Sequence, residues 1–194
     1  MIDLVPSEVL KPRDVTHRPA MSDGELPGFL AKLEGCQGDV HTVRALHLLM
    51  LTATRPGEVR GAMWSEFDLD ADLWIIPAER MRMKMEHRVP LSRQAVEVVR
   101  SMQALCGDRV LVFPSPFYPV KSLSENTFNS ALARMGYKGS ATAHGIQALF
   151  STVAKECGWN PDVIERQHAH IEGNRVRAAY HRALYPEDRE KLMQ

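Results

Sequence analysis

The sequence predicts a mainly α-helical fold with a small antiparallel β-sheet, in the α+β class. Segments with apolar residues at helical spacing dominate the chain, whereas only two short segments have strand character. The 194 residues are 44% hydrophobic, which is enough for one core. Residues 1–20 show no clear period and are expected to form a linker or extended lead-in. Residues 21–194 are expected to form one domain, with 186–194 as a C-terminal tail.

Capping residues mark the expected helices. Ser22 and Glu25 have the spacing of a capping box, followed by apolar residues at helical spacing. The segment VHTVRALHLLMLTA (40–53) is dense in Leu and Met, which predicts a central core helix. A short helix is expected after the break at Pro56-Gly57. Further helices are expected over 92–107, 124–136, 143–158, 160–170, 174–185 and 186–194.

A sheet of two or three strands is predicted. Two of them can be located, LWIIP (73–77) and HRVPL (87–91), with AERMRMKME (78–86) between them. If the connecting segment is extended, its alternation places Met81, Met83 and Met85 on one face. Arg80, Arg82 and Lys84 then share the other face. This basic face either carries chemistry or is a charged sheet edge that prevents aggregation.

Composition excludes several classes of protein. Lys plus Arg equal Asp plus Glu at 24 each, so the chain cannot coat DNA by bulk charge, although a local basic groove remains possible. Three widely spaced cysteines fit neither a disulfide framework nor a metal site, which favours the reducing cytoplasm. The N-terminus does not resemble a signal peptide. The longest near-apolar stretch, residues 45–53, is too short to cross a bilayer.

Several residues are candidates for chemistry. Arg55 follows an apolar helix in a turn fixed by Pro56-Gly57, where a guanidinium suits a phosphate; the alternative is an ordinary surface capping arginine. Glu58 is expected to orient Arg55 or to cap the next helix. Tyr180 stands among small residues, where either packing or nucleophilic chemistry is compatible with the pattern, and Tyr185 is its alternative.

Three histidines, His144, His168 and His170, raise the question of a metal. On a helix, His168 and His170 would point about 200° apart. No acidic or Cys ligand completes a recognisable set. A metal site is therefore not expected.

Four segments in order resemble one family: LLMLTATRPGEVRGAMWSEFDLD, LWIIPAERMRMKMEHRVPLS, TAHGIQALF and IERQHAHIEGNRVRAAYHRALY. Together they are similar to the catalytic domain of tyrosine recombinases, in the branch of prophage integrases. The resemblance implies site-specific DNA recombination through a 3′-phosphotyrosyl intermediate, without metal or ATP. By position it implies Tyr180 as nucleophile, with Arg55, His144 and His170 around the phosphate.

Two positions depart from the family pattern. Gln147 stands where the family has a second arginine, and an amide brings no charge. Arg82 stands where the family has its acid lysine, and arginine is a poor general acid. Lys84, two residues on, is the expected substitute. A degenerate integrase that binds DNA but cleaves poorly is therefore the alternative function, and a histidine-based metal hydrolase is a distant third.

The resemblance also implies partners. Double-stranded DNA carrying an attachment site is expected to contact Arg55, Arg80, Arg82 and Lys84, and protomers are expected to assemble on it as a tetramer. No membrane partner is expected. The tail 186–194 is expected either to contact a neighbouring protomer through Leu192 and Met193 or to be a frayed terminus. The family's upstream DNA-binding domains are not expected in this chain, which begins in the linker.

Overall fold

Helices form most of the structure, a computed structural model that describes residues 21–36, 38–169 and 185–194. The α-helices are α1 (Leu26–Glu34), α2 (Val40–Thr52), α3 (Pro56–Arg60), α4 (Arg93–Cys106), α5 (Thr127–Leu132), α6 (Gly145–Glu156), α7 (Pro161–Gln167) and α9 (Pro186–Met193). The short turns are η1 (Asp23–Glu25), η2 (Trp64–Glu66) and the π-helical η3 (Ala133–Tyr137). The strands are β1 (Phe67–Asp68), β2 (Leu73–Ile76) and β3 (His87–Pro90). The predicted mainly helical fold with a small antiparallel sheet is confirmed.

The sheet has the order β1-β2-β3 and is antiparallel throughout. Trp74 of β2 pairs with Phe67 on one side and with Val89 on the other. Its indole is fully buried and stacks on the Phe67 ring, with 5.1 Å between ring centroids. Both predicted strands are present. The third strand, β1, falls within the expected two or three strands, but it could not be located because two residues are too short for an alternating pattern.

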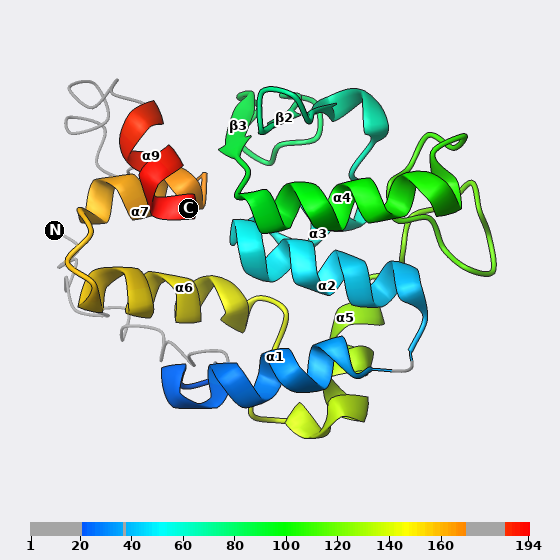
Figure 1. Cartoon of the computed structure of the whole chain (residues 1–194), viewed down its shortest axis with the longest axis horizontal. Helices are drawn as coiled ribbons and strands as arrows, with labels where there is room; N and C mark the ends of the chain where they lie inside the picture. Colours follow the sequence, from blue (N-terminus) through cyan, green and yellow to red (C-terminus); the bar gives the residue numbers. More distant parts are fainter. Residues whose placement is uncertain (1–20, 37, 170–184) are drawn as a thin grey trace, which may run out of the picture.

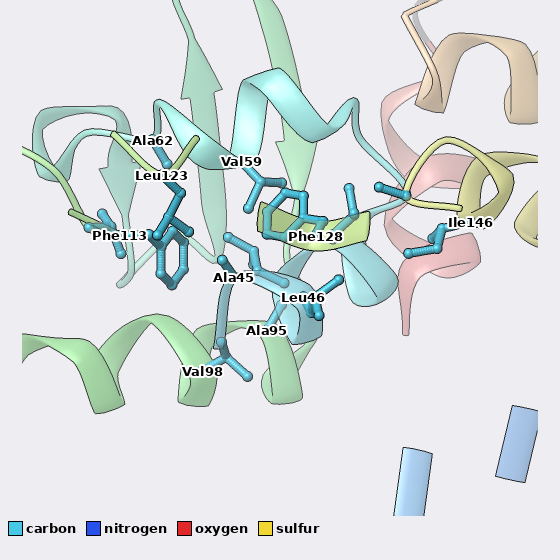
Figure 2. Packing of buried hydrophobic residues seen from close by; sticks show 14 of the residues in the cluster. Ala45, Leu46, Val59, Ala62, Ala95, Val98, Phe113, Leu123, Phe128 and Ile146 are labelled. Carbon is cyan, nitrogen blue, oxygen red and sulfur yellow. The ribbon is translucent and has the colours of Figure 1, made fainter. Parts of the chain in front are cut away.

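Helix α2 is the centre of the core, as its composition predicts. It packs against α1, α3, α4 and α5, and Figure 1 shows it beside α4. Ala45, Leu46, Leu48 and Leu49 are all fully buried, and Figure 2 shows the first two among the side chains of neighbouring elements. The helix ends at Ala53, whose φ of 50° is in the left-handed region. This ending turns the chain sharply toward α3.

The C-terminal helices surround one end of this core. Asn160 caps α7, because its side chain accepts a hydrogen bond from the Asp162 amide at 2.9 Å, and Pro161 occupies the first helical position. Helix α7 ends at Gln167, three residues before the predicted boundary. Helix α9 packs against α7 and β3, beside α7 in Figure 1. The predicted helix over 174–185 lies almost entirely outside the described residues.

The segment 78–86 is not extended, so the predicted basic face is wrong. It forms successive turns, in which the Arg80 amide bonds the Pro77 carbonyl at 3.0 Å and the Lys84 amide bonds the Met81 carbonyl at 3.1 Å. Met81 is buried, whereas Met83 is exposed. The turns form because the Arg80 side chain is drawn inward to a buried carboxylate. In the part of the chain that the structure describes, no helix has the length and apolar content to cross a membrane.

Candidate active site

Arg55 lies at the start of α3, where its side chain is held from two sides. Its Nη1 donates to Glu58 Oε1 at 3.0 Å, and its Nη2 donates to the Ala169 carbonyl at 3.1 Å. Glu58 also accepts from the Arg55 amide at 2.8 Å, so the carboxylate both orients the guanidinium and caps α3. Both roles expected of Glu58 are therefore confirmed. About 20% of the Arg55 side chain is exposed, which leaves the guanidinium accessible to an anion.

Three consecutive residues at the end of α7 clasp the turn between α2 and α3. Gln167 Nε2 donates to the Thr52 carbonyl at 2.8 Å, and His168 Nδ1 lies 3.0 Å from the Ala53 carbonyl. Ala169 completes the set by accepting from Arg55. We call this arrangement, residues 167–169 on residues 52–55, the clamp. It fixes Arg55 relative to the chain that leads directly into His170.

His168 is a structural member of the clamp. The ring is 1% exposed, and its Nε2 lies 2.8 Å from Ser151 Oγ. Because a carbonyl can only accept, Nδ1 must carry a hydrogen toward Ala53. The Phe150 ring meets the imidazole edge to face at 5.5 Å between centroids. His168 is thus engaged on both nitrogens inside the fold.

Gln147 points toward the same turn. Its Nε2 donates to the Ala53 carbonyl at 3.0 Å, from the first turn of α6. The amide is half-buried beside the His168 ring. Gln147, which stands at the family's arginine position, therefore contacts the clamp at Ala53, two residues before Arg55. His144, one turn earlier, is exposed at the N-terminus of α6.

Arg80 connects the turn 77–86 to α3, the helix that begins after Arg55. Its guanidinium forms an ion pair with Glu66, whose side chain is 4% exposed and also accepts from the Trp74 indole at 3.0 Å. Arg80 Nη2 donates to the Glu58 carbonyl at 2.5 Å. The Arg80 donors are thus directed into the protein rather than outward, because Glu66 needs a cation when buried.

Arg82 and Lys84 are the exposed cations of this turn. Lys84 has a φ of 52°, and its ammonium lies 3.4 Å from the Glu79 carbonyl, a long contact. A groove of about 1140 Å³ separates the turn from α9 and the end of α7. Met81 and Arg88 line one wall, and Arg166 and Ala169 line the other.

The remaining predicted site residues, His170 and Tyr180, lie outside the described residues. Tyr185 is described and is the cap residue that precedes α9, with a φ of 46°. Among the described ranges, no three His, Cys, Asp or Glu side chains are grouped to hold a metal ion.

Four residues of this region escaped sequence reasoning: Ser151, Gln167, Glu66 and Arg189. Gln167 and Ser151 act on partners distant in sequence, and polar side chains on a helix carry no signal for that. Arg189 had a weak signal, since it stands four residues before Met193, which is buried with it on one helical face.

Comparison with known proteins identifies the protein family to which the chain belongs. The model of the phage integrase family matches residues 21–187. The integrase of Enterobacteria phage P4 is 42% identical over 194 aligned positions, covering 92% of this chain. The prophage integrase IntA of Escherichia coli K12 is 36% identical over the whole chain. The chain therefore belongs to the phage integrase family, as its resemblance to tyrosine recombinases predicts. It spans 44% and 48% of the length of these two relatives.

Solved structures agree on the fold. The integrase of mycobacterium phage Brujita superposes with a TM-score of 0.67 at 17% identity, covering 94% of this chain and 59% of that one. A lambda integrase dimer bound to a COC′ core site superposes with a TM-score of 0.62 at 14% identity, covering 90% of this chain and 62% of that one. The architecture is that of a tyrosine recombinase catalytic domain.

Proposed function

We propose that this chain is the catalytic part of a prophage-type integrase, which cuts and rejoins DNA at specific sites. The observation that carries the proposal is the clamp: it holds the Arg55 guanidinium against Ala169, the residue before His170. The bond joins Arg55 to a residue 114 positions further along the chain. Family membership and relatives named as integrases support the same activity.

The reaction follows from these roles. The Tyr180 hydroxyl oxygen attacks the scissile phosphorus, forming a 3′-phosphotyrosyl bond while the bond to the 5′-oxygen breaks. Arg55, His144 and His170 donate hydrogen bonds to the phosphate oxygens, which gain charge in the transition state. A general acid, Lys84 in this proposal, protonates the departing 5′-oxygen. Attack by another 5′-hydroxyl reverses the step and rejoins the strands, so neither metal nor ATP is consumed.

Activity is proposed to be slowed by two substitutions. Gln147 replaces a charged donor by a neutral amide, and loss of one aimed donor typically costs on the order of 100- to 1,000-fold in rate. Arg82 at the acid position retains its proton. The second candidate function, a domain that binds DNA without cutting it, rests on these same two residues alone, and membership of the integrase family does not favour it.

Double-stranded DNA is the proposed partner, with Arg55, Arg82 and Lys84 contacting its backbone. The solved relative bound to a core site supports this assignment. Because the net charge is zero, binding is expected to depend on this local set and to weaken steeply with salt. We propose self-association on DNA as a tetramer, and a cytoplasmic location.

The decisive experiment traps the covalent intermediate. The protein is incubated with a pool of nicked attachment-site duplexes, from which the fragment beyond the cleavage point diffuses away, and adducts are separated on a denaturing gel. Tyr180→Phe should abolish the adduct, and Tyr185→Phe should retain it. Adduct formation should be insensitive to a chelator. DNA binding without any adduct from the wild type would favour the non-cutting alternative, and exchanged behaviour of the two variants would overturn the nucleophile assignment.

A further inference from the structure

Arg189 is a buried cation that the proposed chemistry does not use. It lies in the middle of α9, is 6% exposed and points toward α7 and β3. Its Nε and Nη2 donate to Gln167 Oε1 at 3.1 and 3.0 Å, and Nη2 also donates to the Arg88 carbonyl at 2.5 Å. The acceptors in these three bonds are an amide oxygen and a main-chain carbonyl, which carry no charge.

Burying a guanidinium against neutral acceptors is costly. Burial, followed by the nearby positive charge of Arg166, lowers the pKa of Arg189 to about 10. A helix that only needed to adhere to the domain would be served equally well by an apolar side chain at this position. What the guanidinium adds is geometry, because its planar fork fixes the direction of an acceptor.

Gln167, whose side chain accepts from Arg189, is part of the clamp. Gln167 is fully buried, and its side-chain amide is held at both ends: Oε1 by Arg189, and Nε2 by the Thr52 carbonyl at 2.8 Å. The Gln167 main-chain carbonyl lies 3.1 Å from His87 Nε2, so the backbone is held as well. Burial, followed by the charge of Arg189, lowers the pKa of His87 to about 3, and the ring is therefore neutral and donates from Nε2.

The next two residues, His168 and Ala169, connect Gln167 to the candidate site. His168 bonds the Ala53 carbonyl, and the Ala169 carbonyl accepts from Arg55. A displacement of Gln167 therefore moves the acceptor that holds the catalytic guanidinium. Two successive hydrogen bonds, from Arg189 to Gln167 and from Gln167 to the Thr52 carbonyl, link Arg189 to residues 52–55.

We propose that Arg189 is a positioning residue: by orienting Gln167 it aligns the clamp and Arg55, so that the docking of α9 on its own domain is coupled to cleavage. This inference rests on the proposed function for its kinetic readout. It assigns α9 a role in the alignment of the site within one protomer. Arg189 itself touches neither the phosphate nor the nucleophile in this scheme.

Three variants of the full chain test it. Arg189→Met keeps the length and apolar stem but removes every donor, and Arg189→Lys keeps the charge without the fork. Lys191→Met removes an exposed charge from the same helix and serves as the matched control. Each is measured for single-turnover adduct formation on the nicked duplexes, for affinity toward the same DNA, and for thermal unfolding.

A second readout is independent of cleavage. Long-range ¹H–¹⁵N spectra of the imidazoles report which His168 nitrogen carries the hydrogen, and the wild type should show a single form with Nδ1 protonated. Arg189→Met should broaden or shift this signal while the protein remains folded. Lys191→Met should leave it unchanged.

The expected result is a split between rate and binding. Arg189→Met should slow adduct formation at least about tenfold, since small misplacements of catalytic groups are costly, and should change DNA affinity less than about threefold. Arg189→Lys should recover part of the rate. An unchanged rate and an unchanged His168 signal in Arg189→Met would overturn the proposal. A wild type that forms no adduct would instead refute the proposed function, and the His168 spectra alone would then decide whether Arg189 aligns the clamp.

Discussion

The clamp and the turn 77–86 are two basic regions built on opposite principles. In the clamp, Arg55 is held by a carboxylate and a carbonyl, and its neighbours Gln167 and His168 are buried. In the turn, Arg82 and Lys84 are exposed, and the ammonium of Lys84 is near one carbonyl at 3.4 Å. One region has its guanidinium held by protein acceptors, whereas the other has exposed side chains with few contacts.

This difference separates two tasks of a phosphate site. Donors that stabilise a transition state act best when they need no reorganisation, which favours buried, bonded positions. A group that delivers a proton to a departing oxygen has to reach it, which a side chain on an exposed turn can do. Under the proposed function, the fixed donor is therefore held by α2, α3 and α7, and the adjustable contacts lie on the β2–β3 connection.

The largest expected effect comes from breaking the anchor of the turn. Arg80→Met leaves Glu66 buried without its cation, so the free energy of unfolding should fall by about 3–5 kcal/mol. Urea denaturation measures this. Arg82→Met, two residues away and exposed, should change stability by less than about 0.5 kcal/mol. Equal losses in the two variants would mean that the turn does not depend on this ion pair.

Next in size is the effect of loosening the clamp at Arg55. Arg55→Lys retains a charge but loses the planar fork that directs separate nitrogens at Glu58 and Ala169, so adduct formation should slow on the order of 100- to 1,000-fold. A single-turnover time course on nicked duplexes measures the rate. Arg93→Lys, at an exposed position on α4, is the control and should behave like the wild type. A small loss would place the phosphate elsewhere.

The third prediction assigns the proton donor in the turn. Lys84→Met should slow cleavage about 100-fold, a typical contribution of a general acid. A substrate with sulfur in place of the departing 5′-oxygen needs no proton, and on it the variant should regain the wild-type rate. Arg82→Met should lose less and show no such rescue. If the rescue follows Arg82 instead, the assignment of the acid to Lys84 is wrong.

The smallest expected effect is a gain inside the clamp. Gln147→Arg can keep a donor on the Ala53 carbonyl and add charge toward the phosphate, so adduct formation should rise at least about tenfold. Binding should change less than rate, because the new contact strengthens in the transition state. Gln147→Met is the matched loss of the donor and should be slower than the wild type. A slower Gln147→Arg would indicate that the amide is needed as it is.

Much of the fold could be predicted from local signals. Asn160 capped α7 as expected, the apolar density of 40–53 marked the core helix, and both main strands were found. The segment 78–86 was misjudged, because alternation alone does not reveal that a buried Glu66 will draw Arg80 inward. The Glu66 carboxylate and the Arg80 guanidinium belong to residues 14 positions apart, so no local sequence pattern connects them.

Site residues were predicted only where a motif carries them. The structure brings the Gln147 amide to the Ala53 carbonyl, two residues before Arg55. The roles assigned to Arg55, Gln147, His170 and Tyr180 stay predictions. Gln167 and Arg189 were missed because they bond main-chain carbonyls and each other. Every residue has a main-chain carbonyl, so the sequence does not indicate which one is used.

That dependence on main-chain carbonyls has a consequence for how such proteins diverge. The acceptors at positions 52, 53 and 169 are present whatever side chains those positions carry. Mutation can alter the donors of the clamp but cannot delete these acceptors, except by changing the path of the backbone. A lineage could therefore lose a catalytic charge, as proposed here for Gln147, while the backbone that positions the remaining groups is kept. Reversion then requires one side chain rather than a rebuilt site.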